Sequence, residues 1–392
     1  MLQKRKINLF LFAAFILLAE SVFISCAKKT EEKKTIQEDF SEFEFNGKKL
    51  HGKKIQPDYA TQFCIYEYED GFSLIDICGK EKYLIVPEEK YSEGLTCAAD
   101  GIIKRGMENI YLASSSAYSL WDALGASGKL GFSSIKENDW YIPSASDAMK
   151  CGKMLYAGKY RMPDYELLLK SGCKLAIEST MILHVPKVKE KLEQLGIGVF
   201  TDYSSYENNP LGRLEWIKVY GEISGCQEAA FSFFNSQANL LKNIIFDSKE
   251  IRSSYFYINT RGMAVVRSPD NYVSNMLKCA GSDYLCPKIK NDTDLASRPT
   301  LSVSMEEFYK SSKTADFLFY DGNIDPSCTS LAMLKEKNPL LAEFTAVKNG
   351  KVWCAKKLIY QDTAEICQII LDMNKIFSAA DDKEIFFFER LK

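Results

Sequence analysis

The sequence predicts an α/β fold of two lobes that one long helix joins, with a β-meander at the front of the first lobe. Helical and strand patterns alternate along residues 158–200, a helical pattern runs through residues 222–245, and residues 55–86 hold short apolar runs between tight turns. Alternation of strands and helices at this spacing is typical of parallel sheets with crossover helices. The tight turns of residues 55–86 instead predict antiparallel hairpins.

The alternation is clearest in residues 158–200. Pro163 opens a predicted helix that is rich in leucine, and Gly172 ends it. The next run, KLAIE, has the length and apolarity of a buried strand. An amphipathic helix follows over residues 187–195, Gly196 ends that helix, and IGVF is the next strand. We therefore expect two parallel strands with a helix between them.

The rest of the pattern divides between the two lobes. Residues 110–113 predict the first buried strand of the first lobe, with a serine-rich loop at its carboxyl end. The second lobe begins with the strand patterns SSYFYI and MAVVRS and ends in an amphipathic helix over residues 362–377. Since both lobes contain helix, buried strand and polar loop in that order, we expect both to be Rossmann-like.

These patterns define five segments. The predicted boundaries are a lipoprotein signal peptide at 1–25, a flexible tether at 26–45, a first lobe with its meander at 46–221, a linking helix at 222–250, and a second lobe at 251–392. Gly225 is the only interruption in the pattern of the linking helix. At about 1.5 Å per residue, such a helix is long enough to join two lobes.

The N-terminal segment predicts the location of the protein. A basic start at residues 4–6 precedes the apolar run 8–18, which is short for a transmembrane helix. The segment ends in VFISC, which resembles a bacterial lipoprotein box with Cys26 as the lipidated residue. We expect a cell-envelope protein, periplasmic or on the cell surface, held to the membrane by lipid on Cys26. The alternative is an ordinary secretory signal with a chance cysteine.

Composition limits the partners and the metal chemistry. The formal net charge of −2 gives no electrostatic reason to expect nucleic acid. Apart from Cys26 there are eleven cysteines, an odd number without CxxC spacing, so we expect no zinc site. We expect most of them to be buried thiols, and Cys279 and Cys286 to be the pair best placed to form a disulfide.

The sequence offers little for catalysis. His51 and His184 are the only two histidines, and no GxSxG, P-loop, GxGxxG or HExxH motif is present. We therefore predict that the chain is not an enzyme and that it has no catalytic residues.

Binding has better support. In open α/β lobes, ligands lie beyond the carboxyl ends of the strands, and the loops predicted there are rich in tyrosine, serine and arginine. For each tyrosine alone, half-buried packing with the hydroxyl in water is the alternative. The candidate ligand-binding residues are Ser115, Ser116, Tyr118, Met181, His184, Tyr203, Ser204, Tyr206, Arg261, Arg267 and Tyr320.

The order of features resembles one family, the solute-binding proteins of ABC importers for ferric siderophores, haem and cobalamin. Pro163, Glu166 and the LGI at 195–197 stand where that family has them, and AVKNGKVW is similar to its penultimate turn and strand. The resemblance implies a ligand held between the lobes and delivered to an ABC permease dimer with its ATPase subunits. A ferric siderophore or similar iron chelate is the first expectation, with haem or cobalamin next and no permanently bound cofactor.

The resemblance also suggests roles for single residues. Arg261 and Arg267 would pair with carboxylates of the ligand, and His184 is a candidate axial ligand to iron or cobalt, with an ordinary surface or core histidine as the alternative. Glu166 and Glu306 would dock onto arginines of the permease, with Glu307 as a substitute for Glu306. Both are also the acidic residues that helix N-termini favour.

Two functions from other classes remain open at this point. One is an anchored extracytoplasmic hydrolase, which requires a histidine, cysteine or carboxylate pair with a perturbed pKa. The other is a surface adhesin that uses the same fold to hold a host component.

Overall fold

The computed structural model describes residues 42–242, 244, 250–288, 298–379 and 381–392. The predicted signal peptide and Cys26 lie outside the described residues. The predicted tether extends too far, because Glu42–Phe45 forms strand β1 and pairs antiparallel with β2 (Lys48–Ile55). Phe43 and Phe45 alternate with glutamates and point into the core, which favours a strand. No helix of the described residues is long and apolar enough to span a membrane.

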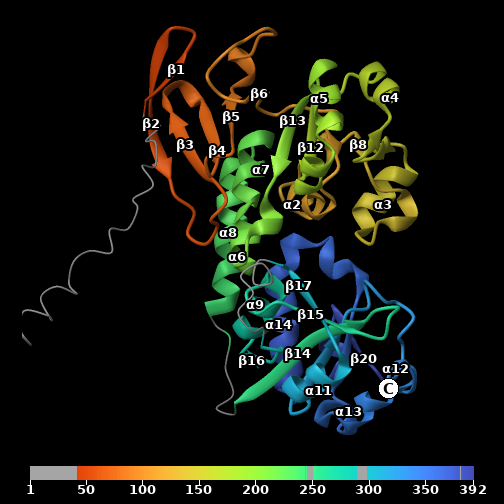
Figure 1. The fold of residues 1–392 in the computed structure, drawn as a ribbon. Helices are drawn as coiled ribbons and strands as arrows, with labels where there is room; N and C mark the ends of the chain where they lie inside the picture. Colours follow the sequence, from red (N-terminus) through yellow and green to blue (C-terminus); the bar gives the residue numbers. More distant parts are fainter. Residues whose placement is uncertain (1–41, 243, 245–249, 289–297, 380) are drawn as a thin grey trace, which may run out of the picture. The chain divides into compact units, whose positions relative to one another are not determined.

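The predicted meander is present and larger than expected (Figure 1). Its six strands lie in sequence order, antiparallel up to β5, with β6 parallel to β5. Asp70 and Gly71 both adopt positive φ in the turn between β3 and β4, as tight turns require. The further strands are β3 (Cys64–Tyr68), β4 (Ser73–Ile77), β5 (Glu81–Val86) and β6 (Gly101–Lys104).

The first lobe contains a five-stranded, wholly parallel sheet in the order β13-β12-β7-β8-β9. The predicted helix after Pro163 begins where the Asp164 side chain accepts from the Leu167 N–H. The strands are β7 (Tyr111–Leu112), β8 (Phe132–Ser133), β9 (Leu155–Tyr156), β12 (Leu175–Ser179) and β13 (Gly198–Asp202). The helices are α2 (Tyr118–Ala123), α3 (Pro143–Lys150), α4 (Tyr165–Lys170) and α5 (Pro186–Gln194).

The linking helix predicted over 222–250 is broken into two at Gly225, and residues 243 and 245–249 of it lie outside the described residues. Helix α7 (Ile217–Ser224) ends at Gly225, whose φ of 84° is left-handed, and α8 (Gln227–Lys242) starts anew. A Cβ on Gly221 would lie 2.6 Å from the Ala230 Cβ, so α7 and α8 pack closely side by side. The linking segment is therefore α8, which α6 (Pro210–Glu215) and α7 precede.

The second lobe has a mixed sheet and so departs from a purely parallel arrangement. Strand β14 is parallel to β16 and β18 but antiparallel to β15, and the order is β17-β15-β14-β18-β19-β20 with β16 also beside β14. The strands are β14 (Ile251–Ile258), β15 (Ala264–Arg267), β16 (Ser282–Tyr284), β17 (Thr300–Val303), β18 (Phe317–Tyr320), β19 (Val352–Ala355) and β20 (Phe388–Arg390). The helices are α9 (Tyr272–Cys279), α11 (Met305–Ser312), α12 (Leu331–Lys337), α13 (Thr345–Lys348) and α14 (Ile366–Phe377).

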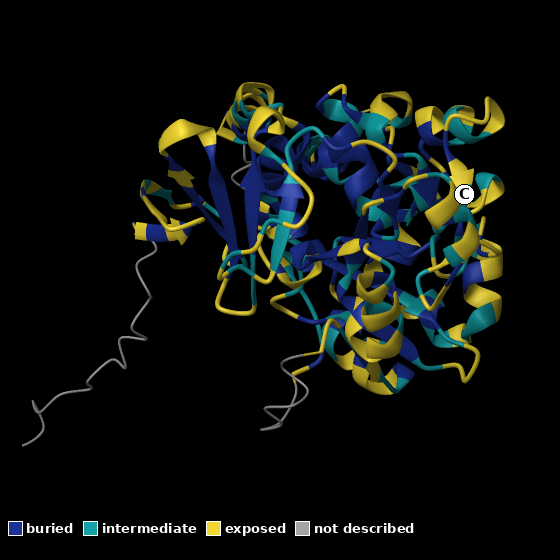
Figure 2. Cartoon of the chain, turned by 90° about the horizontal axis from the view of Figure 1, so that it is seen from above, coloured by how far each residue is buried: buried dark blue, intermediate teal, exposed yellow. Residues whose placement is uncertain are grey.

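One hydrophobic core runs from the meander into the second lobe. Figure 2 colours the buried residues of the chain dark blue. The core includes Ile75 of the meander, Trp121 of the first lobe, Tyr220 of α7, and Tyr255 and Ile369 of the second lobe. The lobes are therefore joined by shared apolar packing as well as by α8, which resists wide bending at the joint.

The cysteines differ from the expectation. All eleven in the described residues are free thiols, so the pair best placed to form a disulfide, Cys279 and Cys286, is not bonded. Four are buried, four are intermediate and three are exposed, so most are not buried. Burial raises the pKa of the Cys64, Cys173 and Cys328 thiols to about 11, which keeps these three protonated. The described residues hold no cluster of histidine, cysteine and carboxylate groups that could bind a metal ion.

Candidate functional site

Each lobe has a pocket at the carboxyl ends of its strands. The first-lobe pocket, about 410 Å³, is lined by Ala113, Ser134, Ile135, Lys136, Asp139, Tyr156, Lys159 and Tyr160, which follow β7, β8 and β9. The second-lobe pocket, about 650 Å³, is lined by Tyr257, Ile258, Asn259, Thr260, Gly262, Ile324, Asp325, Ser327 and Lys337, mostly from the segments after β14 and β18. This edge of the sheet is where α/β folds bind ligands.

The segment after β19 touches the rim of the first-lobe pocket. The Gln361 Oε1 accepts from the Tyr141 N–H at 2.8 Å, and the Gln361 Nε2 donates to the Asp139 carbonyl at 2.8 Å. Close by, the Ser119 Oγ accepts from the Ala364 N–H at 3.1 Å. The carboxyl edge of the second lobe is therefore fixed against the first lobe beside this pocket.

The predicted residues after β7 are less accessible than expected. Ser115 and Ser116 are half-buried in a 3-10 turn, Ser115–Ala117. Tyr118 is only 1% exposed and its ring packs 5.1 Å from that of Trp140, so it belongs to the core. Burial also raises the pKa of the Tyr118 hydroxyl.

A second group of predicted residues does come together. Met181 and His184 are exposed in the 3-10 turn after β12, and the Thr180 Oγ1 lies 3.2 Å from the Ser205 Oγ of the loop after β13. Tyr203 is buried and Tyr206 is exposed, with their ring centroids 5.7 Å apart. Thr180 and Ser205 therefore bring the two loops together, and Tyr203 and Tyr206 form a ring pair in the second loop.

Sequence reasoning missed one member of this surface. Lys80, from the turn between β4 and β5, lies over the rings of Tyr203 and Tyr206 at 4.4 and 5.6 Å. Only the docking of the meander brings Lys80 there. The predicted Ser204 is buried beside Asp202, whose carboxylate accepts from the Ser204 N–H and from the Ser114 and Tyr220 hydroxyls.

In the second lobe, Arg267 is already paired. Its Nη2 lies 2.5 Å from the Asp321 Oδ2 and also donates to the Tyr360 hydroxyl, which itself donates to the same Asp321 oxygen at 2.8 Å. Burial opposes the charge, but Tyr360, Tyr255 and Asp321 together raise the pKa of Arg267. Since Asp321 neutralises this guanidinium, Arg267 offers little to a ligand carboxylate.

The other two predicted residues of this lobe border the second-lobe pocket. Arg261 is exposed in the turn after β14, where its N–H donates to the Asn259 Oδ1. Tyr320 is fully buried and donates to the Asp325 Oδ2 at 2.6 Å. Burial alone would raise the pKa of Asp325, but hydrogen bonds from Lys337, Ser327 and Tyr320 lower it to about 2.

The two expected docking carboxylates are exposed. Glu166 lies in the first turn of α4, and Glu306 in the first turn of α11. Glu307 is occupied, because its side chain accepts from the Ser304 N–H in a capping box. Of the two neighbours, Glu306 is therefore the one with a free carboxylate.

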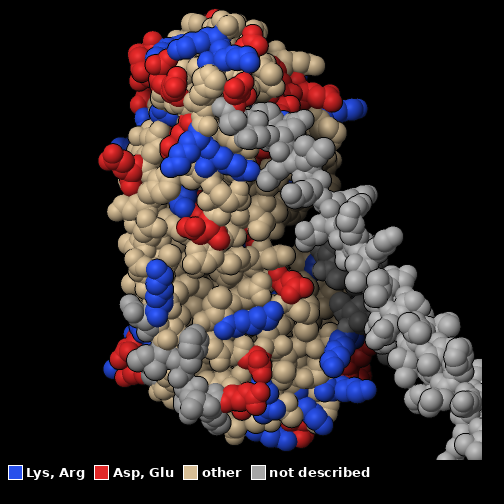
Figure 3. Space-filling model, turned by 90° about the vertical axis from the view of Figure 1, so that its left-hand side faces the viewer, with Lys and Arg blue, Asp and Glu red and all other residues tan. Residues whose placement is uncertain are grey.

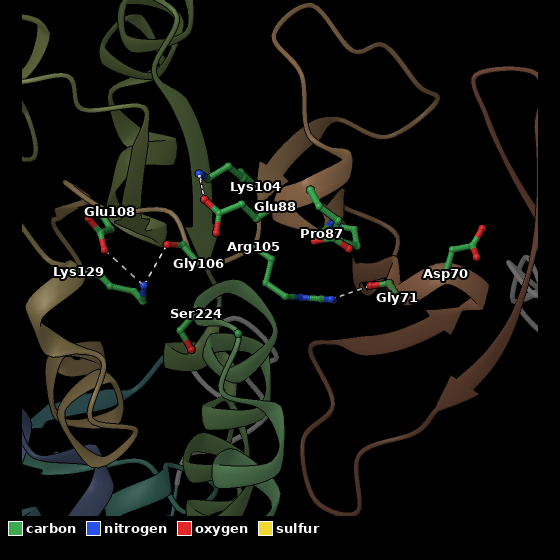
Figure 4. A pocket seen from close by; sticks show the side chains of 12 residues that line it. Asp70, Gly71, Pro87, Glu88, Lys104, Arg105, Gly106, Glu108, Lys129 and Ser224 are labelled. Atoms are coloured by element: carbon green, nitrogen blue, oxygen red, sulfur yellow. Dashed lines mark hydrogen bonds and ion pairs between the residues drawn. The ribbon is translucent and has the colours of Figure 1, made fainter.

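A third pocket, about 640 Å³, lies between the meander and the segments that lead into β7 and β8 (Figure 4). Its cationic side chains are all paired: Lys104 lies 2.7 Å from Glu88, Lys129 lies 3.8 Å from Glu108, and Arg105 lies 3.0 Å from Glu222. Positive and negative side chains are likewise mixed at both ends of the face in Figure 3, whose middle carries few charges.

This arrangement is the two-lobe fold of the periplasmic solute-binding proteins, as expected. The haem-binding protein HutB of Vibrio cholerae matches with a TM-score of 0.54 and 18% identity over 67% of this chain and 96% of HutB. A periplasmic binding protein of Veillonella parvula matches with a TM-score of 0.57 and 17% identity over 74% of this chain and 97% of that protein.

Sequence comparison finds relatives whose names state no ligand or activity. Two uncharacterized lipoproteins of Methanocaldococcus jannaschii are 25% identical over 292 residues and 28% identical over 176 residues. These matches cover 70% and 42% of this chain and span 66% and 42% of the relatives' own lengths. No family model matches the chain.

Proposed function

We propose that this chain is an extracytoplasmic solute-binding lipoprotein that captures a metal chelate and delivers it to an ABC permease. The observation that carries the proposal is the pair of pockets at the carboxyl ends of the strands of two lobes, with the rim of one fixed by Gln361 of the other lobe. A flat or bulky ligand that contacts both edges would be enclosed there.

An iron chelate is the first ligand to test, with haem and cobalamin as alternatives. The similar structures support this range, since they include the haem-binding protein HutB and a possible iron-binding protein of Staphylococcus epidermidis. The latter matches with a TM-score of 0.53 and 16% identity over 68% of this chain and 97% of that protein. These chelates absorb visible light differently. Protein purified from its native host should show the spectrum of one of them, with the matching metal by elemental analysis.

The control for that experiment is the same protein after unfolding, dialysis and refolding, which should be colourless and regain the spectrum on titration. If neither the purified protein nor the refolded protein binds haem, cobalamin or any ferric chelate, the proposed function is wrong. Hydrolysis of an ester or peptide substrate by the same protein would then favour the anchored hydrolase.

Delivery to a permease is tested at Glu166 and Glu306. Because both carboxylates are exposed, reversing them should abolish uptake while the affinity of the free protein for its ligand stays unchanged. The matched control is charge reversal at Glu190 of α5 and Glu336 of α12, which are also exposed. Normal uptake by the Glu166→Lys, Glu306→Lys variant would contradict the docking role.

The anchor is tested at Cys26. Lipid on this cysteine would supply the membrane affinity, so Cys26→Ala should move the protein from the membrane fraction to the soluble fraction. The two relatives named lipoproteins support this proposal. Mass spectrometry that finds no lipid on wild-type Cys26 would contradict it.

A further inference from the structure

A small hairpin forms one wall of the first-lobe pocket. Strands β10 (Gly158–Lys159) and β11 (Met162–Pro163) pair antiparallel, with Tyr160 and Arg161 at the tip. Gly158 has a φ of 81°, and a Cβ there would collide with the Met162 carbonyl oxygen, so only glycine permits this hairpin. The hairpin holds Lys159 and Tyr160 in the lining of the pocket.

The cations at this pocket have no acidic partner. In the part of the chain that the structure describes, no carboxylate lies within ion-pair distance of Lys136, Lys159 or Arg161. Both lysines are exposed, and Asp139 is the one acidic residue among those that line the pocket. The pocket therefore has positive charge that the protein itself does not neutralise.

Among the described residues that line the two other pockets, each cation has an acidic partner. In the second-lobe pocket, Lys337 lies 2.6 Å from the Asp325 carboxylate. In the pocket of Figure 4, Lys104, Arg105 and Lys129 are all paired with glutamates. An anionic ligand would have to displace those partners, whereas at Lys136 and Lys159 it would displace only water.

Aromatic rings stand beside the free cations. The Lys136 Nζ lies 5.7 Å from the ring centroid of Tyr156, and the Arg161 guanidinium lies 5.1 Å from that of Tyr160 and donates to its hydroxyl at 2.8 Å. Tyr156 and Tyr160 are half-buried, so each ring still has surface to offer. Rings and cations together suit a ligand that is both aromatic and negatively charged.

We infer that the first-lobe pocket is an anion-binding subsite that selects polyanionic aromatic chelates, through Lys136 and Lys159, over neutral or cationic ones. The inference rests on the proposed function and specifies its ligand class. Among ferric siderophores, catecholates have this chemistry, because their iron is held by anionic oxygens on aromatic rings. Hydroxamate chelates and cobalamin have little negative charge to place there.

The test uses three probes of different charge, namely ferric enterobactin, ferrioxamine B and cyanocobalamin, and follows the quenching of tryptophan fluorescence. Wild type should bind ferric enterobactin most tightly. The Lys136→Gln, Lys159→Gln variant should lose at least about tenfold in affinity for it, which is about 1.4 kcal/mol, and the loss should shrink in high salt. Lys136→Arg, Lys159→Arg should retain most of the affinity.

The matched control is Lys187→Gln, Lys191→Gln, two exposed lysines of α5 outside the pocket, which should bind like wild type. Unchanged affinity in the Lys136→Gln, Lys159→Gln variant would overturn the subsite and leave the proposed function standing. So would tighter binding of ferrioxamine B or cyanocobalamin by wild type, or a loss confined to Arg261→Gln. If wild type binds none of the three probes, the subsite is overturned. If wild type also binds no other chelate, the proposed function is overturned too.

Discussion

The two lobes differ in what they do with their charged side chains. Among the described residues, Lys136 and Lys159 of the first lobe have no acidic partner at their pocket, whereas the second lobe pairs Arg267 with Asp321 and Lys337 with Asp325. The first-lobe pocket is therefore suited to attract an anionic ligand, whereas the cations Arg267 and Lys337 of the second lobe already have acidic partners. A cation in a binding loop is useful to a ligand only if the fold leaves it free.

Two buried carboxylates, Glu178 of the first lobe and Asp372 of the second, differ in how many hydrogen bonds they accept. In the first lobe, Glu178 on β12 is fully buried, and within the described residues neither of its oxygens has a hydrogen-bond partner. In the second lobe, the buried Asp372 accepts from the Phe386 and Phe387 N–H groups and from the Gln368 side chain. Glu178 is thus a buried carboxylate without hydrogen bonds, whereas both oxygens of Asp372 are hydrogen-bonded, and the predictions below compare paired with unpaired charged groups.

The largest effect is expected where the meander joins the first lobe. The fully buried Glu215 accepts from the N–H groups of Asp58, Tyr59 and Ala60 and from the Lys218 ammonium at 2.6 Å. Glu215→Ala would leave these donors and the Lys218 charge buried without a partner, so it should lower the free energy of unfolding by about 3 to 5 kcal/mol. Urea denaturation at neutral pH measures this loss.

The control for that experiment is Glu228→Ala on the exposed side of α8, which should change stability by less than about 0.5 kcal/mol. If Glu215→Ala were equally harmless, the carboxylate would not be what holds the loop between β2 and β3 on the lobe.

A somewhat smaller loss is expected from the paired arginine of the second lobe. Arg267→Met leaves the Asp321 carboxylate buried without its cation and should cost about 3 kcal/mol in urea denaturation. The Lys136→Gln, Lys159→Gln variant of the first lobe should cost less than about 0.5 kcal/mol, because those lysines are exposed and unpaired. If both variants lost the same free energy of unfolding, paired and unpaired cations would not differ in their contribution to stability.

The buried Glu178 should make the first lobe sensitive to pH. Burial raises its pKa from the ordinary 4.5 to about 8, so the unfolded chain loses this proton at lower pH than the folded protein does. Its contribution to stability is therefore full below about pH 4.5 and is lost as the pH rises toward 8. Glu178→Met should remove this loss. The free energy of unfolding of the variant, relative to wild type, should be about 2 kcal/mol higher at pH 8 than at pH 5, and urea denaturation at the two pH values measures it. An identical pH profile in wild type and variant would show that Glu178 has an unseen partner.

The smallest effect is expected at the contact between the lobes. Burial, with Glu365 and Asp122 nearby, raises the pKa of Asp362 from 3.8 to about 7. Stability contributed by its protonated form is lost as the pH rises from about 4 to 7. Because Asp362 is partly exposed, Asp362→Asn should gain only about 1 kcal/mol at pH 8, measured as the shift in urea midpoint. A gain already present at pH 4 would point to a cause other than this proton.

Much of the fold was predictable from local pattern. Gly172 and Gly196 end their helices as expected, and β12 and β13 pair in parallel, because helix stop signals and apolar runs act within a few residues. The linking helix was mispredicted at Gly225, because the pattern on both sides is helical and a single glycine was taken as an interruption, whereas Gly225 adopts a left-handed φ that ends α7. The mixed sheet of the second lobe likewise could not be predicted from the sequence, because the direction of a strand depends on partners that are distant along the chain.

The sequence by itself determined the class of fold, the loops at the carboxyl ends of the strands and the helix-start positions of Glu166 and Glu306. Only the tertiary structure decided which side chains of those loops are free. It buries Tyr118, occupies Arg267 with Asp321 and Tyr360, brings Lys80 over Tyr203, and leaves Lys136 and Lys159 unpaired at a pocket. The physical reason is that burial and charge pairing depend on neighbours in space, which the order of residues along the chain does not specify.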